Sequence, residues 1–270
     1  MLFYWNAILG FLIGAFVGKF MGLIVNELPK ILLAEDLDGG EPRDIFKGIN
    51  KKPKCLNCNI EVSWSDNLPI IGYLATQGRC KHCHHPSNFR NFLLEVMVAL
   101  LFGILMLCFP FNAPLLFVLI ISCLLICCFI TDFEHGILPD QFTLAIVWVG
   151  LIGSLFPIFI TPRESIIGAV AGYGIFWCFN ELYRSFRGFD GMFPGDFKLN
   201  AGIGACVGLK WLMPILLLSF LFLLSITVLQ LLASKKKEYA NFLYKEAPYG
   251  CYSSIVTGGA LCLLLNGAMH

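Results

Sequence analysis

The sequence is poor in charged residues. Asp, Glu, Lys and Arg make up only 14% of its 270 residues, whereas 57% are hydrophobic. A soluble domain carries about 25% charged residues, so this chain has too little polar surface for a soluble particle and is too apolar to be disordered. Neither sign of charge is in excess, and the net charge of +1 gives no indication of a nucleic-acid partner. The composition predicts an integral membrane protein.

Long apolar runs fill the chain on both sides of one polar stretch, which extends from Asn26 to about Asn91. A helix needs about 20 apolar residues to cross a bilayer. The first run has no basic region before it and no small-residue cleavage site, so we interpret it as a retained span and not as a signal peptide. We expect an all-α, polytopic fold of about eight spans, with seven as the alternative: Phe3–Val25, Phe92–Phe109, Leu115–Ile130, Phe142–Ile160, Ile166–Tyr183, Leu199–Gly208, Leu212–Ala233 and Ser254–Leu265.

Basic residues are concentrated in alternate loops. All but Lys19, Arg163 and Lys210 of the 19 Lys and Arg residues lie in the stretches 30–91, 131–141, 184–198 and 234–250. Because loops rich in Lys and Arg stay on the cytoplasmic side, these four stretches are predicted to face the cytoplasm. The N-terminus is then predicted to lie outside.

Few of the twelve cysteines lie in polar sequence, and most of the others occupy apolar runs, where Cys behaves as a small hydrophobe. Two CxxC pairs 22 residues apart suit a tetrahedral zinc ion. Two disulfides are the alternative, but a reducing cytoplasm disfavours them. Four thiolates leave no open position on the metal, so we predict a structural and not a catalytic zinc site. Its ligands would be Cys55, Cys58, Cys80 and Cys83.

Acidic residues lie at the ends of two apolar runs. Asp132 follows the third run, just before a helix break predicted at Gly136 and Pro139. Asp196 follows Gly195, which permits an unusual turn, and falls near the start of the sixth run. Carboxylates at such positions in membrane proteins are costly and are therefore candidates for function.

Two carboxylates at opposed helix ends, 64 residues apart in sequence, could meet in space. Such a pair would share one proton, and one member would act as general base on water while the other acts as general acid on a scissile carbonyl. Periodicity alone does not distinguish this dyad from a proton or cation path in a transporter. The neighbouring Asp140 and Asp190 are interpreted as helix caps or solvated residues.

These segments resemble the prepilin peptidases, the bifunctional leader peptidases and N-methyltransferases of type IV pilus and type II secretion systems. The resemblance covers nearly the whole chain. Several positions depart from the pattern, in the first span (18–22 and Glu27), after the cysteine loop (87–88 and 91–92) and at Phe193, which stands where the family commonly has a glycine. The similar segments are Cys55 and Cys58, 63–69, 78–80, Cys83, Arg90, Glu95, Asp132 with Glu134, 138–140, 165–169, 172–173, 195–199 and 248–250.

The resemblance implies an aspartic peptidase whose pair is Asp132 and Asp196. Its substrates would be prepilins or pseudopilins, cut in the bacterial inner membrane, at the cytoplasmic face, after the glycine that ends a short basic leader. The family then methylates the new terminal amine from S-adenosylmethionine. No glycine-rich nucleotide motif follows a strand, so no residues are assigned to that cofactor. Supporting roles would fall to Glu134, Asp140, Gly195 and Lys198.

Three functional regions follow from these expectations: a first span at 1–29, a cytoplasmic zinc loop associated with methyl transfer at 30–91, and a membrane peptidase region at 92–270. Lys198 is expected either to steady a nearby carboxylate or lipid phosphate, or simply to extend to the membrane interface. Two other functions remain open at this point. The chain could be a catalytically impaired scaffold that binds prepilins, or a transporter with a zinc loop.

Overall fold

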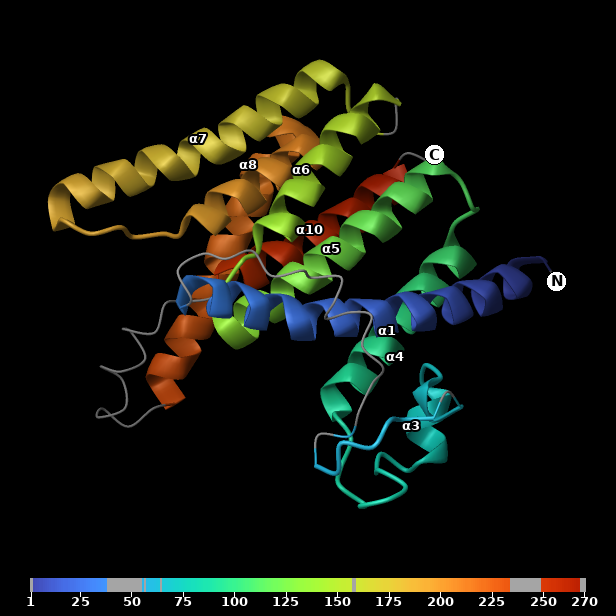
Figure 1. The fold of residues 1–270 in the computed structure, drawn as a ribbon. Helices are drawn as coiled ribbons and strands as arrows, with labels where there is room; N and C mark the ends of the chain where they lie inside the picture. The colour runs from blue at the N-terminus through green and yellow to red at the C-terminus, as the bar shows by residue number, and fades with distance from the viewer. Residues whose placement is uncertain are drawn as a thin grey trace. The chain divides into compact units, whose positions relative to one another are not determined.

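The computed structural model describes residues 2–37, 55, 57–63, 65–156, 159–233 and 249–267. Residues 38–54 and 234–248, which belong to two of the predicted cytoplasmic loops, lie outside the described residues. The all-α prediction is confirmed (Figure 1). The helices are α1 (Leu2–Leu37), η1 (Ser65–Asn67), α3 (Ile71–Ala75), α4 (Phe89–Cys108), α5 (Ala113–His135), α6 (Asp140–Leu155), α7 (Pro162–Arg187), α8 (Pro194–Ala233) and α10 (Tyr249–Gly267).

The described residues contain six helices that are long and apolar enough to cross a membrane, namely α1, α4, α5, α7, α8 and α10. This number is smaller than the eight spans expected from the sequence, for two physical reasons. Helix α6 has only 16 residues, fewer than a bilayer crossing usually needs. The runs Leu199–Gly208 and Leu212–Ala233 are two helical segments that meet at a kink at Gly208 (φ 72°, ψ 170°), where the break was predicted. They follow each other without a loop and together make one candidate span, α8.

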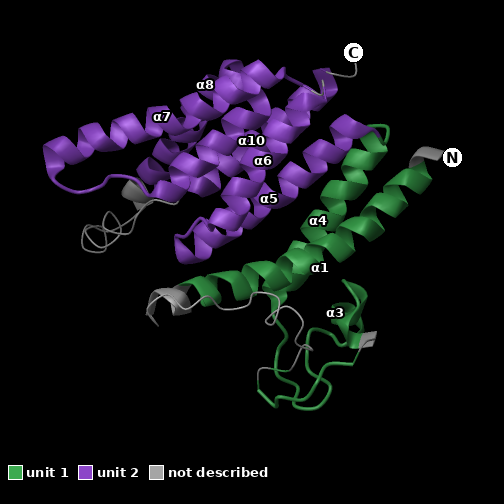
Figure 2. Cartoon of the chain, turned by 45° about the horizontal axis from the view of Figure 1, so that its top comes forward, with its two compact units in different colours: residues 1–111 green, residues 112–270 purple. Residues whose placement is uncertain are grey.

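The chain forms two compact units, residues 1–111 and 112–270 (Figure 2). In the first unit α1 packs along α4, and glycines let the two backbones approach closely. A Cβ atom on Gly14 would lie 2.7 Å from the carbonyl oxygen of Val98. Helix α4 therefore packs with α1, although the prediction groups it by function with the later helices.

In the second unit α8 contacts α6, α7 and α10, and α5 packs against α10 and α6. Helices α7 and α8 touch through their backbones, because a Cβ atom on Gly168 would lie 2.2 Å from the carbonyl oxygen of Gly204. Next to this contact the Ser165 hydroxyl donates to the carbonyl oxygen of Ala205 at 2.7 Å. This packing fixes the first half of α8, which carries Asp196.

Candidate active site and metal centre

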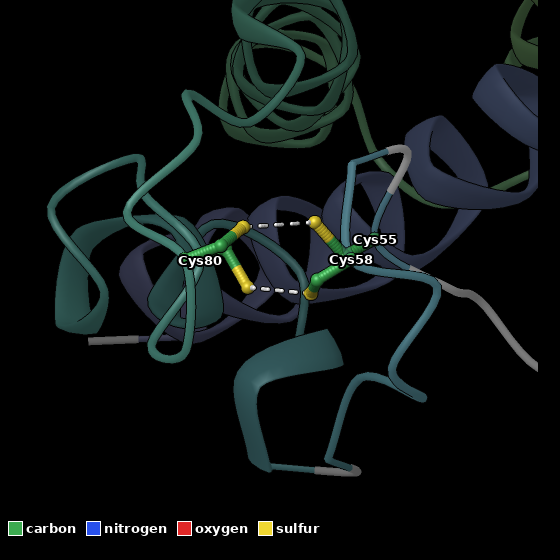
Figure 3. A group of neighbouring side chains, drawn as sticks. Cys55, Cys58 and Cys80 are labelled. Carbon is green, nitrogen blue, oxygen red and sulfur yellow. Dashed lines mark hydrogen bonds between the residues drawn. The ribbon is translucent and has the colours of Figure 1, made fainter.

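The four polar cysteines come together in the first unit (Figure 3). All four sulfur atoms lie within 4.8 Å of one another. The Sγ atoms of Cys55 and Cys83 are 3.6 Å apart, and those of Cys58 and Cys80 are 3.9 Å apart. Four sulfurs at about 2.3 Å from one zinc ion form a tetrahedron with edges of about 3.8 Å. The cluster can therefore hold a metal ion, and its geometry fits zinc.

The two CxxC turns share a backbone hydrogen bond and a left-handed residue. In the first, the N–H of Asn59 donates to the carbonyl oxygen of Cys55 at 3.0 Å. In the second, the N–H of His84 donates to the carbonyl oxygen of Cys80 at 3.0 Å. Asn59 and His84 each have φ 56°, a left-handed conformation that Asn and His tolerate better than most residues. Each turn thus presents two sulfurs on one side.

Backbone N–H groups in these turns also favour thiolates. Those of Cys58 and Asn57 lower the pKa of Cys55 to about 6, and those of Cys83 and His82 lower the pKa of Cys80. The N–H of Ile60 acts in the same direction on Cys58, but burial and the neighbouring thiols outweigh it and raise the pKa of Cys58 to about 11. A divalent cation among the sulfurs would favour the thiolate form of all four.

Glu95 links this cysteine module, residues 55–88, to the helices of the same unit. Its Oε2 atom accepts a hydrogen bond from the N–H of Ile70 at 2.7 Å, and its Oε1 lies 3.7 Å from Nζ of Lys19 in α1. Ile70 has φ 58°, a strained conformation for a β-branched residue. Tyr73 stacks on Phe92 of α4 with ring centroids 4.3 Å apart. The module is therefore held by α4 as well as by its own turns.

Asp132 lies in the last turn of α5, which ends at Gly136 (φ 65°). Its side chain is buried, with 7% of the residue exposed. The Oδ2 atom accepts a hydrogen bond from the backbone N–H of Cys251 at 2.9 Å. A Cβ atom on Gly250 would lie 3.0 Å from the same oxygen. The first described turn of α10 thus lies directly against this carboxyl group.

Asp196 lies in the first turn of α8 and is 8% exposed. Its backbone N–H donates to the carbonyl oxygen of Phe193 at 3.0 Å. Its carbonyl oxygen accepts from the side chain of Asn200 at 2.8 Å, and the Asn200 side chain accepts from the Tyr249 hydroxyl at 3.3 Å. Asp196 is therefore also tied to the first described turn of α10.

The structure consequently brings both aspartates to one segment, Tyr249–Cys251. Leu138, in the connection between α5 and α6, lies close to glycines next to both aspartates. A Cβ atom on Gly195 would be 2.8 Å from Cβ of Leu138, and one on Gly250 would be 3.0 Å from Cδ1 of the same residue. Leu138 thus contacts the glycines adjacent to both sites. Two buried carboxyl groups at helix ends therefore lie next to glycines, Gly195 and Gly250, that both pack against Leu138.

Of the predicted supporting residues, Lys198, Asp140 and Gly195 make contacts between elements, whereas Glu134 lies at the surface. Lys198 pairs with Asp140, since its Nζ atom lies 2.6 Å and 2.7 Å from the two carboxylate oxygens; the pair joins the starts of α6 and α8. Gly195 packs against Leu138 as described above. Glu134 is exposed at the end of α5, and its Oε2 lies 3.9 Å from Nε2 of His135. Phe193 has no positive φ, so the backbone there does not require glycine.

Sequence reasoning did not identify two residues that contact these aspartates, Asn200 and Cys251. Asn200 follows Asp196 by four residues and so shares its helix face. That signal was present in the sequence. Cys251 gave none, because it participates through its backbone N–H.

The fold and these sites define a multi-pass membrane protein with two buried carboxyl groups at helix ends and a four-cysteine module. The family model described as "Bacterial Peptidase A24 N-terminal domain" matches residues 12–109, and "Type IV leader peptidase family" matches residues 118–228. The chain belongs to the type IV prepilin leader peptidase/N-methyltransferase family, peptidase family A24.

Relatives named "Prepilin leader peptidase/N-methyltransferase" match most of the chain. The protein of Dichelobacter nodosus is 32% identical over 77% of this chain and 78% of its own length. That of Burkholderia pseudomallei strain K96243 is 34% identical over 77% and 71%, and that of Klebsiella pneumoniae is 32% identical over 80% and 91%. No solved structure matches the chain.

Proposed function

We propose that this chain is a membrane aspartic endopeptidase that removes the leader of type IV prepilins or pseudopilins and then methylates the new N-terminal amine. One observation carries the peptidase assignment. Asp132 and Asp196, from different helices, are both buried and both tied to Tyr249–Cys251. Family membership supports the substrate class and the second activity.

In the proposed reaction the two carboxyl groups share one proton, because neighbouring like charges disfavour double ionisation. The ionised member removes a proton from water, which attacks the carbonyl carbon of the scissile peptide bond. The protonated member donates its proton to that carbonyl oxygen. The carboxyl group that took the proton from water then gives it to the leaving amine nitrogen as the C–N bond breaks, and a hydroxyl of the tetrahedral intermediate returns a proton to the other carboxylate. The hydrogen bond from Cys251 holds Oδ2 of Asp132 in place, so its carboxyl group enters the reaction already oriented.

The cysteine module would have a structural role. We infer that Cys55, Cys58, Cys80 and Cys83 hold zinc, because their sulfur spacing fits a closed tetrahedral site. The metal would stabilise a segment that has few apolar residues of its own. S-adenosylmethionine, when bound, would supply an activated methyl group for the amine that cleavage releases. We assign this second reaction to the first unit.

We further propose that the active site faces the cytoplasm of a bacterial inner membrane, with the N-terminus outside. The predicted cytoplasmic stretches contain 16 of the 19 basic residues. Asp132, at the end of α5, and Asp196, at the start of α8, lie within two of these stretches, 131–141 and 184–198. A short basic leader would then meet the site from the cytoplasmic side.

The test is processing of a prepilin by the purified protein in detergent, read by intact mass. The wild type should remove the leader mass, and with S-adenosylmethionine present should add about one methyl mass. Asp196→Ala should leave the prepilin intact. If the wild type leaves several candidate prepilins uncleaved but binds them, the chain is a scaffold, and the peptidase proposal is wrong.

A further inference from the structure

Asn180 is a buried amide on α7 that the proposed reaction does not use. Only 7% of the residue is exposed, in a part of the helix where its neighbours Phe176 and Tyr183 are aromatic. Burying an amide is costly unless its hydrogen bonds are made. Its contacts therefore show what it does for the protein.

The amide binds the loop that connects α7 to α8. Its Oδ1 atom accepts hydrogen bonds from the backbone N–H groups of Gly191 at 2.8 Å and Met192 at 3.0 Å. Its Nδ2 atom donates to Oδ1 of Asp190 at 2.9 Å. The chemistry fixes the orientation of the amide, because only its oxygen can accept from two N–H groups and only its nitrogen can donate to a carboxylate.

Two further contacts hold the same loop against α7. Asp190 lies 3.7 Å from a guanidinium nitrogen of Arg184. A Cβ atom on Gly191 would lie only 2.7 Å from the ring of Tyr183, so the loop backbone lies directly on that side chain. The loop thus follows the surface of α7, with Asn180 satisfying three of its polar groups.

This loop determines where α8 begins. Helix α7 ends at Gly188 (φ 81°), and α8 starts at Pro194. Phe193, the residue after Met192, accepts the backbone hydrogen bond of Asp196. A shift of Gly191 and Met192 would therefore move the first turn of α8, and with it the Asp196 carboxyl group, relative to Asp132.

We propose that Asn180 is a positioning residue for Asp196, acting through the loop 190–193. This inference rests on the proposed function, because it takes Asp196 as one of the two reacting carboxyl groups. A displacement of about 1 Å at a reacting group can cost about 100-fold in rate. We call the three hydrogen bonds between the Asn180 amide and the loop the Asn180 clamp. The clamp matters for the turnover number more than for substrate affinity, because Asn180 sets geometry at the carboxyl pair.

The test exchanges the two groups of the clamp. Asn180→Asp places a carboxylate against that of Asp190 and should lower kcat about 10- to 100-fold, with KM changed less than about threefold. The double variant Asn180→Asp/Asp190→Asn lets the carboxylate accept both backbone N–H groups while the amide donates from the loop. It should restore kcat to within about threefold of the wild type. Asn180→Ala should lower kcat without rescue by Asp190→Asn.

Ser185→Ala, an exposed change on the same helix, is the matched control and should behave as the wild type. Rates are taken per monodisperse enzyme, so loss of folded protein does not count as loss of kcat. Wild-type kcat in Asn180→Asp and Asn180→Ala, or equal loss in the single and double exchange variants, would overturn the clamp. Asp196→Asn is measured in parallel, because its continued cleavage would instead disprove the proposed function.

Discussion

In the cysteine module each ligand has a partner three residues away, and two short turns of the same design supply all four sulfurs. The carboxyl centre has the opposite construction, since Asp132, Asp196 and Tyr249–Cys251 come from three helices distant in sequence. A local site of this kind gains its stability from the metal it binds. The carboxyl centre depends on helix packing. Changes should therefore affect the two centres separately.

The largest expected effect separates chemistry from folding. Asp132→Asn and Asp196→Asn should each lower prepilin cleavage by about a thousandfold or more, because the missing acid or base contributes at least about 100-fold and the two groups act together. Abundance and bound metal should match the wild type, since neither residue belongs to the first unit. Intact-mass assays and metal analysis measure both. Normal processing by either variant would contradict the dyad.

The converse change is Cys58→Ser. We expect loss of bound zinc and a several-fold fall in abundance, because zinc binding contributes about 10–16 kcal/mol to folding of small zinc modules. In the protein that remains, the rate of methylation should fall more than the rate of cleavage. Cys108→Ser, at an exposed position at the end of α4, is the matched control. Full abundance without bound metal would argue against a structural role for the ion.

A smaller effect should come from crowding the contact that joins the two aspartates. Gly250→Ala would place a Cβ atom 3.0 Å from Oδ2 of Asp132. Overpacking of this kind costs about 1–3 kcal/mol, and if that strain falls on the reacting geometry, cleavage should fall about 10-fold. Gly258→Ala, on the same helix with open space around it, should have no effect. Equal rates in the two variants would show that this contact is not critical.

Glu95 tests whether the module also depends on the helices. Glu95→Ala removes the acceptor for the Ile70 N–H and should cost about 1–3 kcal/mol, seen as faster metal release to a chelator. Glu95→Gln keeps an acceptor and should release metal more slowly than the alanine variant. If both variants release metal at the wild-type rate, the module is stable on its own turns alone.

The same difference in construction explains what the sequence could predict. The four-cysteine cluster follows from spacing alone, because its ligands are local. The helix ends at Gly136 and Pro194–Gly195 follow from turn-forming residues next to acidic ones. Most of the all-α fold follows from the apolar runs. These features need no knowledge of long-range packing.

Two features required the structure. The contribution of Cys251 is made by a backbone N–H, which leaves no mark on residue type. Asn180 acts on a loop ten residues away, and no local pattern shows that contact.

The smallest effect is expected at Lys198, whose ion pair with Asp140 joins the starts of α6 and α8 within the second unit. Both side chains are partly exposed, at 29% and 55%, so the pair is worth about 1 kcal/mol or less. Lys198→Met should lower cleavage about two- to fivefold at low salt, and the difference should shrink at high ionic strength because salt screens the pair. Asp140→Asn should give the same loss, and the double variant no more than either, because both changes break one interaction. Unchanged cleavage in Lys198→Met would leave the lysine with no role at the carboxyl centre beyond its position at the membrane interface.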